Sequence, residues 1–91
     1  MHEILVVEDE KIIRDSLVRL LKRNDYGVTA VGSVEMAEKE GLQGFDLIIA
    51  DLRLPGSPGT DLIALAAPLP VLIMTSYSSV QSAVDAMKLG A

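Results

Sequence analysis

The stretch that decides the fold is "FDLIIADLRLPGSPGT", residues 45–60, in which an apolar run leads directly into an aspartate. Residues 47–50 are all apolar and precede Asp51. A short apolar run that is bounded by turn residues is typical of a buried strand. Prolines and glycines between positions 55 and 59 then break the chain. We therefore predict a strand over 45–50, with Asp51 at its carboxyl end.

Strand-like and helix-like segments alternate along the rest of the chain. Apolar runs predict three further strands, at 3–7, 28–31 and 71–75. Helical periodicity and capping residues predict helices over 11–23 and 34–40, a short helix that is capped by Thr60 or Asp61 and runs through 67, and a last helix that starts at the capping box 78–81 and is closed by Gly90. This alternation predicts an α/β fold, a parallel sheet with helices on both faces. The length of 91 residues fits one domain, 1–91.

The composition narrows the classes of function. The chain has no cysteine, which excludes disulfides and thiolate metal sites and fits a reducing cytoplasm. It has no apolar run of membrane-spanning length, so we expect no membrane partner. Its net charge of −5 argues against direct binding of nucleic acid, because phosphates select a basic surface. An acidic chain is better suited to a divalent cation.

Polar side chains follow three of the predicted strands. Glu8 and Asp9 follow the first, Asp51 the third, and Thr75 and Ser76 the fourth. The carboxyl ends of parallel strands meet at one edge of a sheet, where crowded carboxylates would raise one another's pKa. Mg²⁺ prefers carboxylate oxygens and would relieve this repulsion. These residues predict a Mg²⁺ site with Asp51 as an oxygen nucleophile toward a phosphoryl group, and they also suit plain Mg²⁺ binding.

Each of these residues has a simpler interpretation as well. Asp51 alone could cap a turn, and Glu8 and Asp9 could cap the helix that follows them. Thr75 could be an ordinary polar residue at a strand exit. The combination of the three strand ends favours the site over the separate alternatives.

Three segments together resemble a known family. "ILVVEDE" (4–10), "DLIIADLRLPG" (46–56) and "VLIMTSYSSVQSAVDAMKLGA" (71–91) look like a bacterial two-component response-regulator receiver domain. They look most like the receivers that precede sigma-54-dependent transcription activators. The resemblance implies a flavodoxin-like, doubly wound parallel sheet with strand order 2-1-3-4 and a fifth strand beside the fourth.

The resemblance also implies roles for individual residues. Asp51 would be the phospho-acceptor, and Thr75 the hydroxyl that moves toward the phosphoryl group. Mg²⁺ would be held by Asp51, by Asp9, by Glu8 through a water, and by the backbone carbonyl of Arg53. The donor would be a phosphohistidine on a sensor histidine kinase. Such a cytoplasmic domain is phosphorylated itself and switches an output such as transcription; it is not a turnover enzyme.

The sequence departs from the family pattern after position 91. The family continues with a fifth strand, which carries a lysine and a switch aromatic, and with a fifth helix. None of the lysines here (Lys11, Lys22, Lys39 and Lys88) lies at a strand end. We therefore expect a truncated receiver with impaired phosphoryl uptake. We also expect the exposed fourth strand to pair with a second copy, giving a homo-oligomer or a domain-swapped dimer.

Two other functional classes compete with a phosphorylated receiver. The first is a receiver-like interaction or oligomerisation module that binds partners without phosphorylation, which the missing lysine favours. The second is a phosphatase of the haloacid-dehalogenase type. Such phosphatases need a second acid two residues after the nucleophile, and Arg53 stands there.

Overall fold

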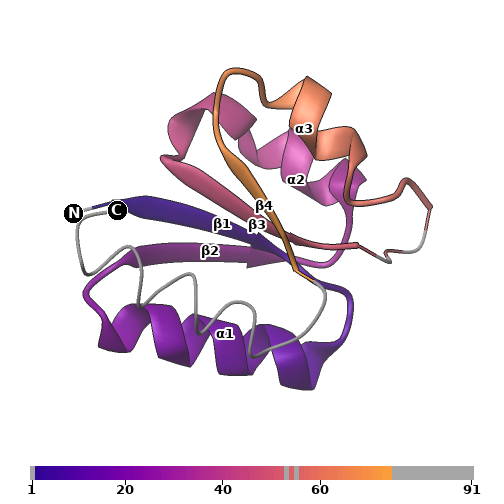
Figure 1. Ribbon diagram of the computed structural model, residues 1–91. Helices are drawn as coiled ribbons and strands as arrows, with labels where there is room; N and C mark the ends of the chain where they lie inside the picture. Colours follow the sequence, from indigo (N-terminus) through magenta and orange to yellow (C-terminus); the bar gives the residue numbers. More distant parts are fainter. Residues whose placement is uncertain (1, 53, 55, 75–91) are drawn as a thin grey trace.

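The computed structural model describes residues 2–52, 54 and 56–74, and its centre is a four-stranded sheet (Figure 1). The strands are β1 (Glu3–Val7), β2 (Gly27–Val31), β3 (Leu47–Asp51) and β4 (Val71–Met74). All pairs are parallel, and the order across the sheet is β2-β1-β3-β4. This order confirms the predicted doubly wound arrangement. The predicted helix over 78–90 lies outside the described residues.

The helices cover both faces of this sheet. Helix α1 (Lys11–Arg23) lies on one face, and α2 (Val34–Glu40) and α3 (Asp61–Leu65) lie on the other (Figure 1). A short 3-10 helix, η1 (Leu42–Gly44), connects α2 to β3. Within the part of the chain that the structure describes, no helix is both long and apolar enough to cross a membrane.

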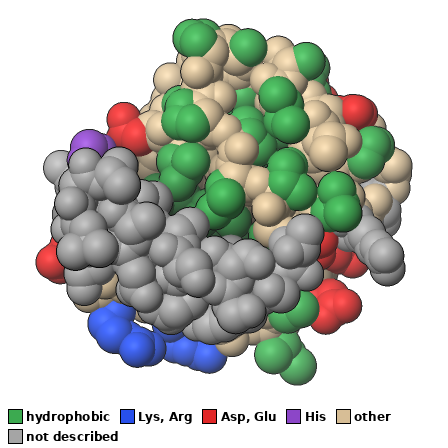
Figure 2. Space-filling view, in the orientation of Figure 1, with side chains coloured by type: hydrophobic (Ala, Val, Ile, Leu, Met, Phe, Trp, Pro, Cys, Tyr) green, Lys and Arg blue, Asp and Glu red, His purple; other side chains and the backbone are tan. Residues whose placement is uncertain are grey.

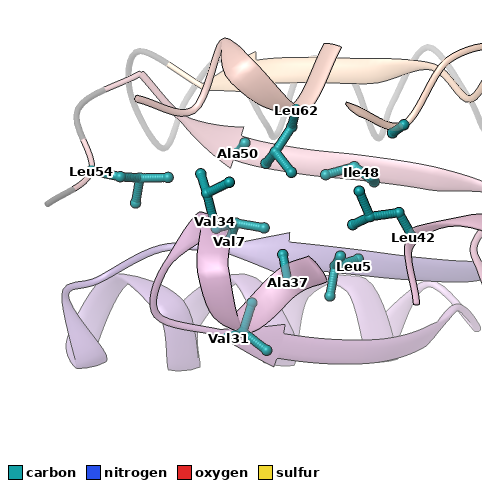
Figure 3. Packing of buried hydrophobic residues seen from close by; sticks show 11 residues of the cluster. Leu5, Val7, Val31, Val34, Ala37, Leu42, Ile48, Ala50, Leu54 and Leu62 are labelled. Carbon is teal, nitrogen blue, oxygen red and sulfur yellow. The ribbon is translucent and has the colours of Figure 1, made fainter. Parts of the chain in front are cut away.

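The pleat of the central strand β1 divides the core into two clusters. Leu5 and Val7 point to the face of α2 and α3, whereas Ile4 and Val6 point to the face of α1. This division follows from the two-residue repeat of a strand, which sends successive side chains to opposite faces. The first cluster contains, among others, the ten residues labelled in Figure 3: Leu5, Val7, Val31, Val34, Ala37, Leu42, Ile48, Ala50, Leu54 and Leu62.

The second cluster fills the space under α1. Leu17, Leu20 and Leu21 are its buried helical residues, and their spacing gives the amphipathic face that the sequence predicts. A sheet with apolar clusters on both faces explains why β1 and β3 read as uninterrupted apolar runs. Both faces therefore hold the carboxyl ends of β1 and β3 in a fixed register.

Three element bounds differ from the sequence prediction. Strand β3 begins at Leu47 and not at 45, and its last residue is Asp51 itself. Helix α3 ends at Leu65, two residues before the predicted end. Strand β2 begins at Gly27, one residue earlier than predicted. For β4, the described residues end at Met74, so the predicted last strand residue Thr75 is not among them.

Candidate functional site

Three carboxylates converge at the carboxyl ends of β1 and β3. The two strands pair in parallel with Val7 opposite Ala50, so the next residues, Glu8 and Asp51, lie side by side at the carboxyl edge of the sheet. Asp9 follows Glu8 in the turn toward α1. The ligand oxygens of Glu8, Asp9 and Asp51 lie within 4.8 Å of one another. Acidic side chains show at the edge toward which these strands run (Figure 2).

Glu8 is the most constrained member of this cluster. Its side chain is fully buried, with 0% exposure, whereas Asp9 is exposed and Asp51 is half-buried. Its backbone N–H donates to the carbonyl of Val31 at 3.0 Å, which extends the contact between β1 and β2. Its own carbonyl accepts a hydrogen bond from Nη1 of Arg14 at 2.9 Å. Glu8 is thus held by the neighbouring strand and by α1.

The two carboxylate oxygens of Glu8 have different surroundings. Oε1 accepts a hydrogen bond from the backbone N–H of Glu10 at 3.3 Å. Oε2 is buried and has no hydrogen-bond donor among the described residues. The neighbouring Asp51 carboxylate is itself an acceptor when ionised. A hydrogen bond between the two acids therefore requires a proton on one of them.

This arrangement shifts the pKa of Glu8 strongly. Burial is the largest cause, followed by the hydrogen bond with Asp51 and the negative charge of Asp51, and the pKa rises from 4.5 to about 8. The charge of Asp9 adds to the rise, while the N–H of Glu10 opposes it. The raised pKa places this proton on Glu8, so that its carboxyl group can donate to Asp51 when no cation is bound. The remaining negative charge of the cluster is charge that a bound cation would neutralise.

The donor set of this cluster fits a hard divalent cation. All three side chains offer oxygen, and Oε2 of Glu8 is a buried acceptor that lacks a donor in the described part. Octahedral Mg²⁺ binds oxygens at about 2.1 Å, so opposite ligands lie about 4.2 Å apart. Oxygens within 4.8 Å of one another need only a small movement or an intervening water to share one ion. The residues present therefore suit Mg²⁺.

The structure leaves two predicted site residues undescribed and bears on the capping alternative. Arg53 and Thr75 lie outside the described residues. Glu10 occupies the N-cap position of α1 and makes no capping hydrogen bond with its side chain. At this turn the side chain of Glu8 accepts the backbone N–H of Glu10. Asp51 is the last residue of β3 and therefore lies in the sheet itself.

Two residues that support the site are absent from the sequence prediction. Arg14 anchors the carbonyl of Glu8, and its only signal in the sequence is its place one turn into α1. Gly59 packs against the end of β3, where a Cβ atom would overlap the backbone carbonyl of Asp51. Position 59 therefore requires glycine, because any side chain would collide with main-chain atoms. A glycine in a Pro/Gly-rich loop gives no sign of such a contact.

Comparisons with known proteins agree with this geometry. The family model described as "Response regulator receiver domain" matches residues 4–91. The transcriptional regulatory protein FixJ of Bradyrhizobium diazoefficiens is 40% identical over 94 residues, which cover 97% of this chain and 45% of FixJ. The transcriptional regulatory protein ZraR of Escherichia coli K12 is 40% identical and is matched over 98% of this chain and 21% of its own length. The chain thus spans less than half of either relative.

A solved structure extends the agreement to the fold. The non-phosphorylated HemR receiver domain from Leptospira biflexa superposes with a TM-score of 0.76 at 31% identity. The match covers 100% of this chain and 77% of that domain. The strand order, the acids at the strand ends and the family match lead to one conclusion. The chain belongs to the family of response regulator receiver domains.

Proposed function

We propose that this chain is a phospho-accepting receiver domain, which takes a phosphoryl group from a sensor histidine kinase onto Asp51 and thereby switches an output. The observation that carries the proposal is the convergence of Glu8, Asp9 and Asp51 within 4.8 Å at the carboxyl ends of two paired strands. Membership of the receiver family supports the same role. The FixJ and ZraR relatives are named transcriptional regulatory proteins, so the proposed output is control of transcription.

Each residue of the site has a part in the proposed transfer. An oxygen of Asp51 attacks the phosphorus of a phosphohistidine, an O–P bond forms, and the N–P bond to the imidazole breaks. Asp9, Asp51 and the carbonyl of Arg53 are the proposed direct ligands for Mg²⁺, and Glu8 acts through a water. Bound Mg²⁺ supplies positive charge that neutralises the phosphoryl oxygens. The Thr75 hydroxyl is the proposed donor to one of these oxygens.

The first experiment measures phosphoryl uptake directly. We expect the intact mass of the chain to rise by one phosphoryl group after incubation with acetyl phosphate and Mg²⁺. Asp51→Asn should abolish the gain, because an amide oxygen is a poor nucleophile. Asp25→Asn is a matched control, since Asp25 has a positive φ of 67° in a turn and asparagine tolerates that conformation. Equal uptake by the Asp51→Asn variant would refute the assignment of the acceptor.

A second candidate function is self-association through β4, which does not require phosphorylation. In the described part of the chain, β4 pairs only with β3 and forms one edge of the sheet. Exposed apolar side chains lie on neighbouring α3, where Ile63 and Leu65 are 52% and 47% exposed. Figure 2 shows apolar side chains gathered over this side of the molecule. An unpaired strand edge can add a strand from a second copy.

Sedimentation equilibrium tests this candidate. We expect the weight-average mass to rise with protein concentration toward that of a dimer, in the absence of Mg²⁺ and of any phosphoryl donor. A monomer mass at every concentration would refute self-association and leave the phospho-acceptor proposal untouched.

A further inference from the structure

The segment that connects Asp51 to α3 is fastened to the rest of the protein at several points. Its described residues are 52, 54 and 56–60. Leu54 is buried in the same apolar cluster as the α2 residues Val34 and Ala37. Gly59 lies directly against the backbone carbonyl of Asp51. A loop rich in proline and glycine is therefore held close to Asp51.

A side-chain hydrogen bond joins this loop to α2. Oγ of Ser57 donates to Oε2 of Glu35 at 2.8 Å, across 22 residues of sequence. Glu35 lies in the first turn of α2, which is capped by the side chain of Ser33. Glu35, which accepts this hydrogen bond, thus lies in a helix whose first turn is capped. We call this hydrogen bond the Ser57–Glu35 latch.

The backbone beside Ser57 is shaped to receive the Glu35 carboxylate. Gly56 has a φ of 77°, and a Cβ atom there would lie 3.4 Å from Oε1 of Glu35. The carboxylate therefore lies against a turn that favours glycine for its conformation. The hydrogen bond from Ser57 is the largest cause of a lowered pKa of Glu35, so the acceptor stays ionised at neutral pH. A charged acceptor strengthens such a bond.

The latch bears on the candidate site because the loop begins at Asp51. The backbone N–H of Leu52 donates to the carbonyl of Met74 at 3.2 Å, and Leu54 is buried, so the described start of the loop contacts both β4 and the core. An exposed polar contact adds little to the stability of a fold. A bond of this kind therefore acts mainly on the segment that it holds.

We propose that the Ser57–Glu35 latch sets the position of the loop after Asp51, which makes Ser57 and Glu35 positioning residues for the cation site. The inference rests on the proposed function for its consequence, Mg²⁺ binding, although the latch itself is a property of the metal-free protein. A movement of α2 would be transmitted to the loop after Asp51 through this hydrogen bond. The latch is a route by which a partner that binds α2 would alter Mg²⁺ affinity.

Hydrogen exchange in the metal-free protein tests the latch by itself. The amides of Asp61 and Leu62 donate to the carbonyls of Pro58 and Gly59, so their exchange reports the order of the loop. We expect Ser57→Ala and Glu35→Ala to speed this exchange about threefold, and Ser57→Thr, which keeps the hydroxyl, to leave it unchanged. The double variant should exchange no faster than either single variant, because both remove one bond.

Matched controls separate the latch from general effects of the substitutions. Ser16→Ala removes a serine hydroxyl on α1 that bonds the carbonyl of Ile12, and it should not affect the loop. Glu38→Ala removes an exposed acid from the same helix as Glu35 and should have no effect. Equal exchange in the parent and in Ser57→Ala, or fully additive effects in the double variant, would overturn the latch.

Calorimetric titration with MgCl₂ tests the consequence for the site. We expect both alanine variants to raise the Kd for Mg²⁺ about threefold, with an unchanged midpoint of urea unfolding, and Ser57→Thr to restore the parent value. Faster exchange with an unchanged Kd would overturn the positioning role while the proposed function stands. A parent chain that binds no Mg²⁺ would overturn the proposed function and the positioning role, while the exchange data still decide whether the latch exists.

Discussion

Among single residues, Glu8 links the charge of the site to the stability of the fold. Its pKa is raised from 4.5 to about 8, first by burial and then by Asp51. Between these values the folded protein holds a proton that the unfolded chain has released. We therefore expect the free energy of unfolding of the metal-free protein to fall as the pH rises from 4.5 to about 8. Urea denaturation in EDTA across this range measures the slope.

The variant Glu8→Gln isolates the contribution of this acid. It should flatten the dependence on pH, because glutamine has no proton to lose. Asp15 and Glu35 have lowered pKa values, so their stabilising effect is lost only when the pH falls below their ordinary range near 4. They do not interfere above that range. A slope that is the same in the parent and in Glu8→Gln would contradict the buried-acid explanation.

The same substitution should weaken Mg²⁺ binding, although it should stabilise the metal-free protein. Glu8→Gln removes a negative charge from the carboxylate cluster, and changes around a metal site commonly reduce affinity about 10- to 100-fold. We expect a loss of that order in Mg²⁺ affinity at a pH above 8, together with higher stability of the metal-free protein. Calorimetric titration measures the affinity, and Asp25→Asn is the control. Unchanged affinity would exclude Glu8 from the site.

The sequence contains enough information to predict the acids of the site but not the residues that hold them. Glu8, Asp9 and Asp51 follow apolar runs, and a parallel sheet brings such positions together. Arg14 gives no comparable signal, because its contact with the carbonyl of Glu8 depends on how α1 lies on the sheet. Burial of Glu8 is likewise a tertiary property, so its raised pKa could not be predicted from the sequence alone.

Among the elements, the end of β3 and the loop that follows it depend on Gly59. A Cβ atom at this position would overlap the carbonyl of Asp51, and the main chain cannot yield as a side chain can. We expect Gly59→Ala to reduce the free energy of unfolding by about 1–3 kcal/mol, as overpacked sites do. It should also weaken Mg²⁺ binding, since β3, which carries Asp51, would have to move. Urea denaturation and calorimetric titration measure the two effects.

Gly44→Ala is the matched control for this prediction. A Cβ atom at Gly44 has no heavy-atom neighbour within 4 Å. The same chemical change should therefore leave stability and Mg²⁺ affinity nearly unchanged. A similar loss of stability in both variants would show that the close approach at Gly59 does not matter.

The bounds of the elements could be predicted where local signals and tertiary contacts agree. Helices α1 and α2 begin and end at the predicted residues, because their apolar faces and flanking residues point to the same limits. Strand β3 begins two residues late, since the side chain of Asp46 accepts the N–H of Glu3 at 2.7 Å before the ladder starts. Helix α3 ends early because Pro68 disfavours helical backbone in the residue before it.

For the whole molecule, stability rests on two apolar clusters that share β1. Leu17 is fully buried in the cluster under α1. Leu17→Ala removes its side chain, and we expect a loss of about 2–5 kcal/mol in the free energy of unfolding. Because a chain of this size usually unfolds in one step, the loss should appear equally by circular dichroism and by tyrosine fluorescence. Probes that give different midpoints would contradict this coupling of the two faces.

Ile12→Ala provides the comparison within the same helix. Ile12 is 82% exposed, so its removal costs little burial and should change stability by less than about 0.5 kcal/mol. A large loss in this variant would mean that Ile12 is covered in solution, by this chain or by a second copy.

Cation binding at the site and the global stability of the fold are thermodynamically linked. The metal-free fold keeps three acids within 4.8 Å of one another, at a cost that grows as Glu8 ionises. A ligand that binds only the folded state stabilises it by about 2.7 kcal/mol at 100 times its Kd. We therefore expect the Tm to rise with Mg²⁺ concentration, and to rise more above pH 8 than near pH 5, where Glu8 keeps its proton.

Calorimetry with NaCl at matched ionic strength separates binding from screening, which matters for a chain with a net charge of −5. Asp9→Asn should remove most of the Mg²⁺ effect and none of the NaCl effect. Equal shifts with both salts would mean that the acids repel one another without forming a site, since screening alone would then account for the stabilisation.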